Sequence, residues 1–149
     1  MQELLTFLVA ASPLVELRGA IPLALLVYEL PMWQAFFLAV AGNMLPVLLL
    51  PFFGVLVAYL SKNSVVLARL LAWVFERTRR RHEHSFELFR DFALVLFVAI
   101  PLPFTGAWTA TLAAFVFGIP FQRAFPLIFF GVIIAGVVVS MITLGFFQL

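Results

Sequence analysis

Apolar residues form four long segments along the chain, and polar positions mostly lie between them. Three segments carry no charge, and they cover residues 30–61, 92–122 and 124–149. The fourth, residues 4–28, is interrupted only by Glu16 and Arg18. Each segment exceeds the roughly 20 residues that a helix needs to cross the hydrocarbon core of a bilayer. The pattern therefore predicts an all-α integral membrane protein.

Helix-breaking residues divide two of the segments near their middles. The predicted hairpin breaks within residues 4–28 are Pro13, Gly19 and Pro22. Those within residues 92–122 are Pro101 and Pro103, followed by Gly106. Proline removes a backbone donor and disfavours helix at the preceding residue. The arms after the breaks, residues 20–30 and 106–118, reach only about half the membrane at 1.5 Å per residue. Residues 32–60 and 121–147 are predicted to be continuous helices.

The sequence repeats itself at an offset of 89 residues without a gap. Eight identities fall within twenty positions, where this apolar composition would give roughly two by chance. The repeated residues are Leu23, Ala24, Val27, Pro31, Ala35, Phe36, Leu38 and Gly42, matched by Leu112, Ala113, Val116, Pro120, Ala124, Phe125, Leu127 and Gly131. The chain is therefore predicted to be a single membrane domain of two related units, residues 1–61 and 92–149. Broken segments at matched positions of a repeat are typical of transporter binding sites.

Two topologies fit these segments. Four full crossings would place Glu3 in the cytoplasm and Arg123 outside, whereas re-entrant hairpins would place Glu3 outside and Arg123 on the basic side. We favour the hairpins. Each unit then crosses the membrane once, so the two units are inverted repeats whose hairpins enter from opposite faces and meet near the middle.

The linker at residues 62–91 carries seven of the nine basic residues. By the positive-inside rule this linker is predicted to lie in the cytoplasm of a prokaryotic cell, with the protein in the inner membrane. Residues 64–75 have apolar positions at helical spacing but are too short to span, which predicts an amphipathic helix along the interface. Topology alone explains this basic loop, so we expect no nucleic-acid partner.

Composition supports the membrane assignment and excludes several kinds of chemistry. The chain is 65% hydrophobic and 11% charged, with a mean hydropathy of +1.18. It contains no cysteine, so disulfides and thiol chemistry are ruled out. No nucleophile and base lie at one depth, and no zinc-ligand spacing or glycine-rich phosphate loop occurs. We therefore expect neither an enzyme nor a bound cofactor or metal.

Small residues follow one face of the last segment. Gly131 with Ala135, and Gly136 with Ser140, are pairs that let another helix approach closely. Packing within the chain is the simpler interpretation, and a homodimer through this face is the alternative.

Glu16 and Arg18 are the principal candidates for function. A charge at the centre of a membrane helix costs about 3 kcal/mol on insertion scales, so such residues usually pair or face a cavity. Arg18 near the positive end of a half-membrane helix favours an anionic group such as phosphate. The protonation of Glu16 could then depend on whether an anion occupies Arg18. The alternative is that the two charges neutralise each other and only hold the turn.

Polar residues inside the other apolar segments complete the candidate substrate site. They are Asn43, after a glycine in the second segment, and Thr105, Gly106 and Trp108 on the second hairpin. Hydroxyls such as that of Thr109 can instead bond back to helix carbonyls.

The stretches SPLVELRGAIPLAL, AGNMLP and AIPLPFTGAWTA resemble the small multidrug export protein family, which is placed with the DedA and VTT membrane proteins. The resemblance covers nearly the whole chain. It implies opposed re-entrant hairpins, transport of lipids such as undecaprenyl phosphate with proton coupling in relatives, and functional roles for the matching residues, namely Glu16, Arg18, Gly19, Pro22, Asn43, Pro101, Pro103, Thr105, Gly106 and Trp108. The sequence departs from the family pattern at Phe104, where glycine is usual, and a bulky side chain there would narrow the site.

These observations predict a flippase or exporter of an amphiphile with an anionic head, in which Arg18 holds the head group and Glu16 couples protons. Sodium coupling also stays open. Efflux of cationic drugs, with Glu16 as the binding residue, is the alternative within transport. A membrane assembly factor that transports nothing is the alternative outside it.

Overall fold

The computed structural model describes residues 1–79, 84–101 and 105–147, and the regular secondary structure of this part of the chain is entirely helical. In chain order they are α1 (Gln2–Ala11), α2 (Glu16–Leu26), α3 (Met32–Leu48), α4 (Leu50–Lys62), α5 (Val65–Arg79), α6 (His84–Ala99), α7 (Ala107–Val116) and α8 (Phe121–Phe147). The all-helical prediction is confirmed for these residues.

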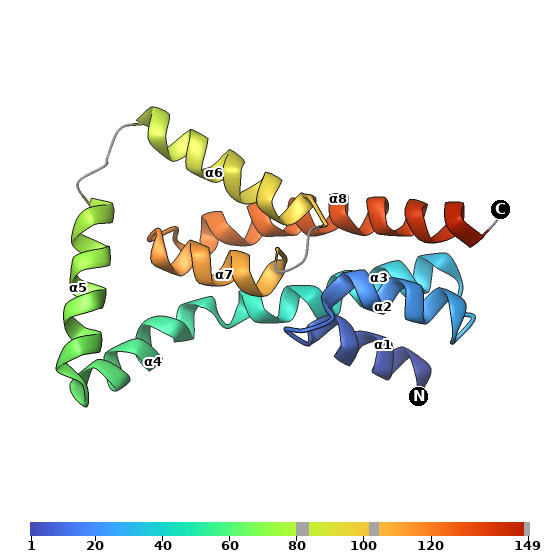
Figure 1. Ribbon diagram of the computed structural model, residues 1–149, viewed down its shortest axis with the longest axis horizontal. Helices are drawn as coiled ribbons and strands as arrows, with labels where there is room; N and C mark the ends of the chain where they lie inside the picture. The colour runs from blue at the N-terminus through green and yellow to red at the C-terminus, as the bar shows by residue number, and fades with distance from the viewer. Residues whose placement is uncertain (80–83, 102–104, 148–149) are drawn as a thin grey trace.

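Two helical hairpins approach each other along the long axis of the molecule (Figure 1). Helix α2 folds back on α1, and α7 folds back on α6. The end of α1 with the start of α2, and the end of α6 with the start of α7, lie near the middle of the molecule, whereas the open ends of the hairpins point in opposite directions (Figure 1). Pro13 lies in the first turn, and Pro101 lies two residues beyond the end of α6.

The first turn comes earlier than predicted. Gly19 and Pro22 lie inside α2, which corrects their assignment as breaks. The chain has already reversed between Ser12 and Val15, so Pro22 costs α2 only the bond that its N–H would have donated to the Arg18 carbonyl. Pro103 and Phe104 lie outside the described residues.

Two helical stretches are long and apolar enough to cross a membrane. They are Met32–Lys62, with a mean hydropathy of 2.2, and Phe121–Phe146, with 2.7. The first was predicted to be continuous, but α3 ends at Leu48 and α4 begins at Leu50. The physical reason is Pro51 at the start of α4, which cannot donate a backbone bond to the turn before it.

Each long helix packs closely against the first arm of its own hairpin, through equivalent glycines. A Cβ on Gly42 would meet the Phe7 carbonyl and Ala10 of α1. A Cβ on Gly131 would lie 2.6 Å from Cβ of Val98 on α6. Gly42 and Gly131 are 89 positions apart, so the sequence repeat corresponds to a repeated helix contact.

The small-residue face of α8 is used within the chain. Gly131 meets α6, and Gly136 meets the Phe36 ring and Leu17. Ala135 and Ser140 are buried. This is the intramolecular packing that the spacing allowed, and a homodimer through the same face stays an untested prediction.

Alanine dominates the contacts between the helices. Nine alanines have no exposed surface, and they are Ala10, Ala20, Ala24, Ala35, Ala39, Ala107, Ala110, Ala114 and Ala124. Small side chains let helix backbones approach closely, which is how helices associate where there is no water to drive apolar burial. Large apolar side chains instead lie exposed on the outside, as a lipid environment requires.

The glycine contact on α8 gives a stability prediction. Gly131→Val should lower the free energy of unfolding by about 1–3 kcal/mol, because the added carbons overlap Val98 and the Val95 carbonyl. Gly145→Val is the control in the same helix, since nothing lies within 4 Å of a Cβ there. Unfolding in detergent, followed by circular dichroism during titration with dodecyl sulfate, measures both. Equal losses in the two variants would contradict the packing described.

Helix α5 lies across the end of the molecule opposite both termini (Figure 1). The predicted amphipathic segment is confirmed as a helix, and it continues beyond residue 75 to Arg79. It packs against α4, and α4 in turn meets α7 through the edge-to-face rings of Phe53 and Phe115, 6.1 Å apart.

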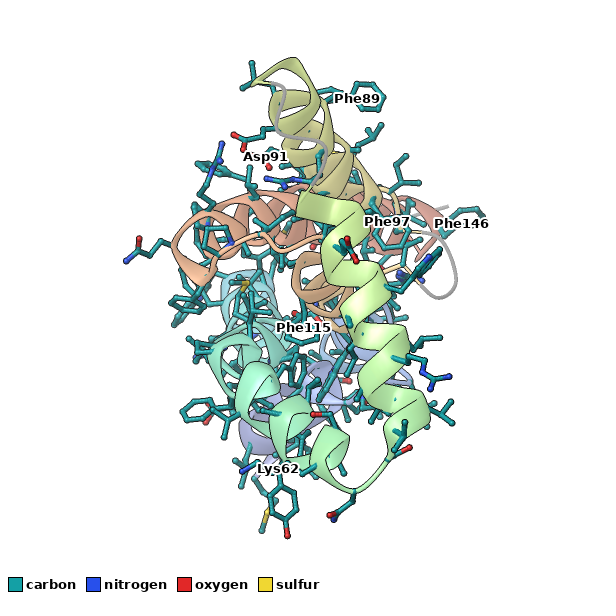
Figure 2. All side chains as sticks on the ribbon, turned by 90° about the vertical axis from the view of Figure 1, so that its left-hand side faces the viewer. Lys62, Phe89, Asp91, Phe97, Phe115 and Phe146 are labelled. Atoms are coloured by element: carbon teal, nitrogen blue, oxygen red, sulfur yellow. The ribbon has the colours of Figure 1, made fainter. Side chains whose placement is uncertain are left out.

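An ion-pair network joins α6 to α8 near the same end. Arg123 bonds Glu87 at 3.2 Å and Asp91 at 3.0 Å. Arg90 contacts Asp91 at 3.3 Å and donates to the Phe117 carbonyl at 3.4 Å, after the end of α7. Figure 2 shows Asp91 on the side of α6 toward α8, with Phe89 pointing away from the molecule.

Candidate functional site

The two hairpin turns touch through side-chain hydrogen bonds. We call residues 11–18 the first tip, and residues 100–101 with 105–108 the second tip. Arg18 donates from Nη2 to Oγ1 of Thr105 at 3.1 Å. Trp108 donates from Nε1 to the Ala11 carbonyl at 2.9 Å. Residues 87 and 97 positions apart are thus held together at the centre of the molecule.

Glu16 lies against the beginning of α7. Its side chain is buried, with 8% of the residue exposed. An added Cβ on Gly106 would fall on Oε2 of Glu16, so the carboxylate rests directly on the glycine backbone. The backbone N–H of Trp108 donates to that carboxylate. Glu16 is therefore fixed to the second hairpin, although it belongs to the first.

The backbone of Glu16 is strained. Its φ of 53° lies in the left-handed region, which non-glycine residues seldom adopt. This conformation aims the side chain at the start of α7 while the chain continues into α2. Strain of this kind persists only where surrounding contacts enforce it.

Three threonines lie at the second tip and in the following part of α7. Thr105 donates to the Ile100 carbonyl at 2.9 Å while accepting from Arg18. Thr109 accepts the Gly106 N–H at 3.0 Å, which satisfies one of the free donors at the start of α7. Thr111 bonds back to the Ala107 carbonyl, as expected for a helix hydroxyl with a purely local role.

Asn43 lies buried in α3, directly after the glycine that contacts the end of α1. Its Oδ1 has no hydrogen-bond partner among the described residues, so the structure does not tie it to Arg18 or Thr105. A buried amide oxygen without a donor is unfavourable by about 1–3 kcal/mol. Asn43 thus offers an acceptor for a group that the protein itself does not supply.

The structure brings together five of the six predicted site residues. Glu16, Arg18, Thr105, Gly106 and Trp108 meet at the tips through the contacts above, whereas Asn43 lies in the neighbouring helix. Sequence reasoning missed the carbonyl of Ala11 and the backbone N–H of Trp108. Backbone groups leave no mark in a sequence, although the two predicted breaks marked the places where such groups would be free.

The chain matches one protein family, described as "Putative small multi-drug export protein", over residues 16–138. It belongs to this family of small multidrug export proteins. The match begins at Glu16, within the first tip, and includes the second tip, Asn43 and most of α8. No curated protein and no solved structure matches the chain.

Membership in the small multidrug export protein family agrees with the two long apolar helices and indicates a membrane export protein. Within the described residues, no three histidine, cysteine or acidic side chains come together as metal ligands. The tips instead offer a guanidinium, a carboxylate and the start of a helix. These groups can bind or release an ion without breaking a covalent bond.

Proposed function

We propose that this export protein moves an amphiphile with an anionic head group across the membrane, and that the head group binds at the two tips. The observation that carries the proposal is the bond from Arg18 to Thr105, which places a partly buried cation where the hairpins meet. A lipid phosphate, such as a polyprenyl phosphate, has the required chemistry.

The proposed topology is a pair of inverted repeats, each with a re-entrant hairpin and one crossing helix. Three observations support it. The hairpins point toward each other in Figure 1, the equivalent glycines make equivalent contacts, and Arg123 lies with the acidic residues of α6 at the end opposite the N-terminus. Residues 62–91 then face the cytoplasm of a prokaryotic cell, and both hairpin turns lie near mid-membrane.

The charges at the tips support an anionic ligand over a cationic one. The guanidinium of Arg18 has a planar fork suited to phosphate or carboxylate. The first turn of α7 carries no acidic residue and has the positive end of a helix dipole. The start of α7 already compensates the negative charge of Glu16, so this carboxylate is poorly placed to attract a cation. We propose that Glu16 couples transport to protons.

A transport assay separates the alternatives. Purified protein in phospholipid vesicles receives one of two fluorescent amphiphiles with the same tail, an alkyl phosphate or an alkyl trimethylammonium. We expect the phosphate to cross faster than in empty vesicles. Faster crossing of the ammonium alone would favour export of cationic drugs. No acceleration of either would favour an assembly factor that transports nothing.

Cysteine labelling tests the topology in cells, because the native chain has no cysteine. With a membrane-impermeant maleimide, Glu3→Cys should label from outside. Gln122→Cys should label only from inside, and it leaves the Arg123 ion pairs intact. In the hairpin topology residues 3 and 122 lie on opposite sides of the membrane. The reverse labelling pattern would establish four full crossings instead.

A further inference from the structure

The start of α7 is already occupied by a carboxyl group, and that group belongs to the protein. The Glu16 carboxylate rests on Gly106 and accepts the Trp108 N–H, which are the contacts that a bound phosphate or carboxylate would make at a helix start. The first turn of α7 carries no acidic residue of its own. Glu16 therefore supplies from another hairpin the negative charge that α7 lacks.

Arg18 stands beside this position on the same tip. It is bonded to Thr105, the residue directly before Gly106, and it interacts electrostatically with Glu16. The ionised Glu16 thus balances the charge of Arg18 and the dipole of α7 together. With Glu16 neutral or moved away, the same groups would carry an unbalanced positive charge.

We propose that Glu16 is an internal ligand of the α7 start, and that it must leave before the head group of the transported amphiphile can bind there. This inference rests on the proposed function. It adds that the start of α7 can hold either the anionic head group or the ionised side chain of Glu16, but not both at once. Protonation of Glu16 would release the site, so each anion bound would be accompanied by one proton.

Other charges cannot easily take over this role. The helices that pack against α2 are α1, α3 and α8. Helix α3 has no charged residue, α1 carries only Glu3 in its first turn, and α8 carries only Arg123 near its start, where it is paired with Glu87 and Asp91. Helix α7 carries no charge. A pH effect on anion binding at the tips therefore points to Glu16.

The test measures equilibrium binding of decyl sulfonate to the purified protein in a neutral detergent between pH 5 and pH 9. Sulfonate stays ionised throughout, so a change with pH comes from the protein. The native protein should bind more tightly as the pH falls, because Glu16 becomes neutral and leaves the site free. Glu16→Gln should bind at high pH about tenfold or more tightly than the native protein, because the competing charge is gone. Its affinity should hardly vary with pH.

Glu29→Gln is the matched control. Glu29 is the other non-glycine residue with positive φ among the described residues, at 52°, and its side chain is exposed beyond the end of α2. Its removal changes the net charge equally and should leave the pH profile of the native protein unaltered. If Glu16→Gln does not fold, the native profile and the Glu29→Gln profile still decide, since binding that does not vary with pH overturns the inference.

The outcomes separate this inference from the proposed function. Sulfonate binding that is equal in the native protein and Glu16→Gln at high pH would overturn the internal-ligand role while leaving an anion transporter. Absence of sulfonate binding at every pH in both proteins would contradict the proposal that the transported substrate is anionic.

Discussion

Replacing Arg18 with alanine should reduce transport of the alkyl phosphate by about one to two orders of magnitude, because a hydrogen bond to a charged group such as this partly buried guanidinium contributes about 1.5–3 kcal/mol. The variant loses the guanidinium at the tips and also its bond to Thr105. The rate of phosphate crossing in vesicles, at equal amounts of folded protein, measures the loss.

Two controls make the Arg18 result specific. Arg18→Lys keeps the charge but not the planar fork, so we expect it to retain part of the activity. Arg69→Ala removes an exposed arginine on α5, far along the chain from either tip, and should transport at the native rate. Normal export in Arg18→Ala together with loss in Glu16→Gln would instead identify a cationic substrate.

Gly106→Ala should destabilise the contact between the tips and strongly reduce transport. The glycine is not needed for its backbone conformation, since its φ of −178° is extended and open to any residue. It is needed because the Glu16 carboxylate occupies the space where a Cβ would be. The added methyl group must therefore displace either Glu16 or the start of α7.

A double-mutant cycle distinguishes this steric cause from any other. In a Glu16→Ala background the space beside Gly106 is empty, so adding Gly106→Ala should cost little further stability. Unfolding in detergent measures the four proteins of the cycle. Gly54→Ala provides the control, because nothing lies within 4 Å of a Cβ at that position. Additive losses in the cycle would show that Glu16 and Gly106 do not meet.

The sequence predicted the parts of this fold that depend on local backbone chemistry. Pro13 and Pro101 marked the places where the hairpins turn, and the 89-residue offset paired Gly42 with Gly131 before their common role in packing was visible. The helix at residues 64–75 followed from its apolar spacing. These features can be predicted without knowing which residues they contact.

Other features depend on contacts between distant segments and could not be predicted. Pro22 stands inside α2 because the chain has already turned before Glu16, which the presence of proline alone does not reveal. The partner of Glu16 is a backbone N–H on another hairpin. Similarly, Arg123 meets Glu87 and Asp91 only because α8 lies beside α6.

The alanines between the helices set how the hairpins can move. A methyl group has no alternative rotamer, so these surfaces cannot adjust by rearranging side chains as a leucine-rich interface does. Any displacement must shift a whole hairpin from one set of alanine contacts to the next. We therefore expect the hairpins to move during transport as rigid elements, in discrete steps.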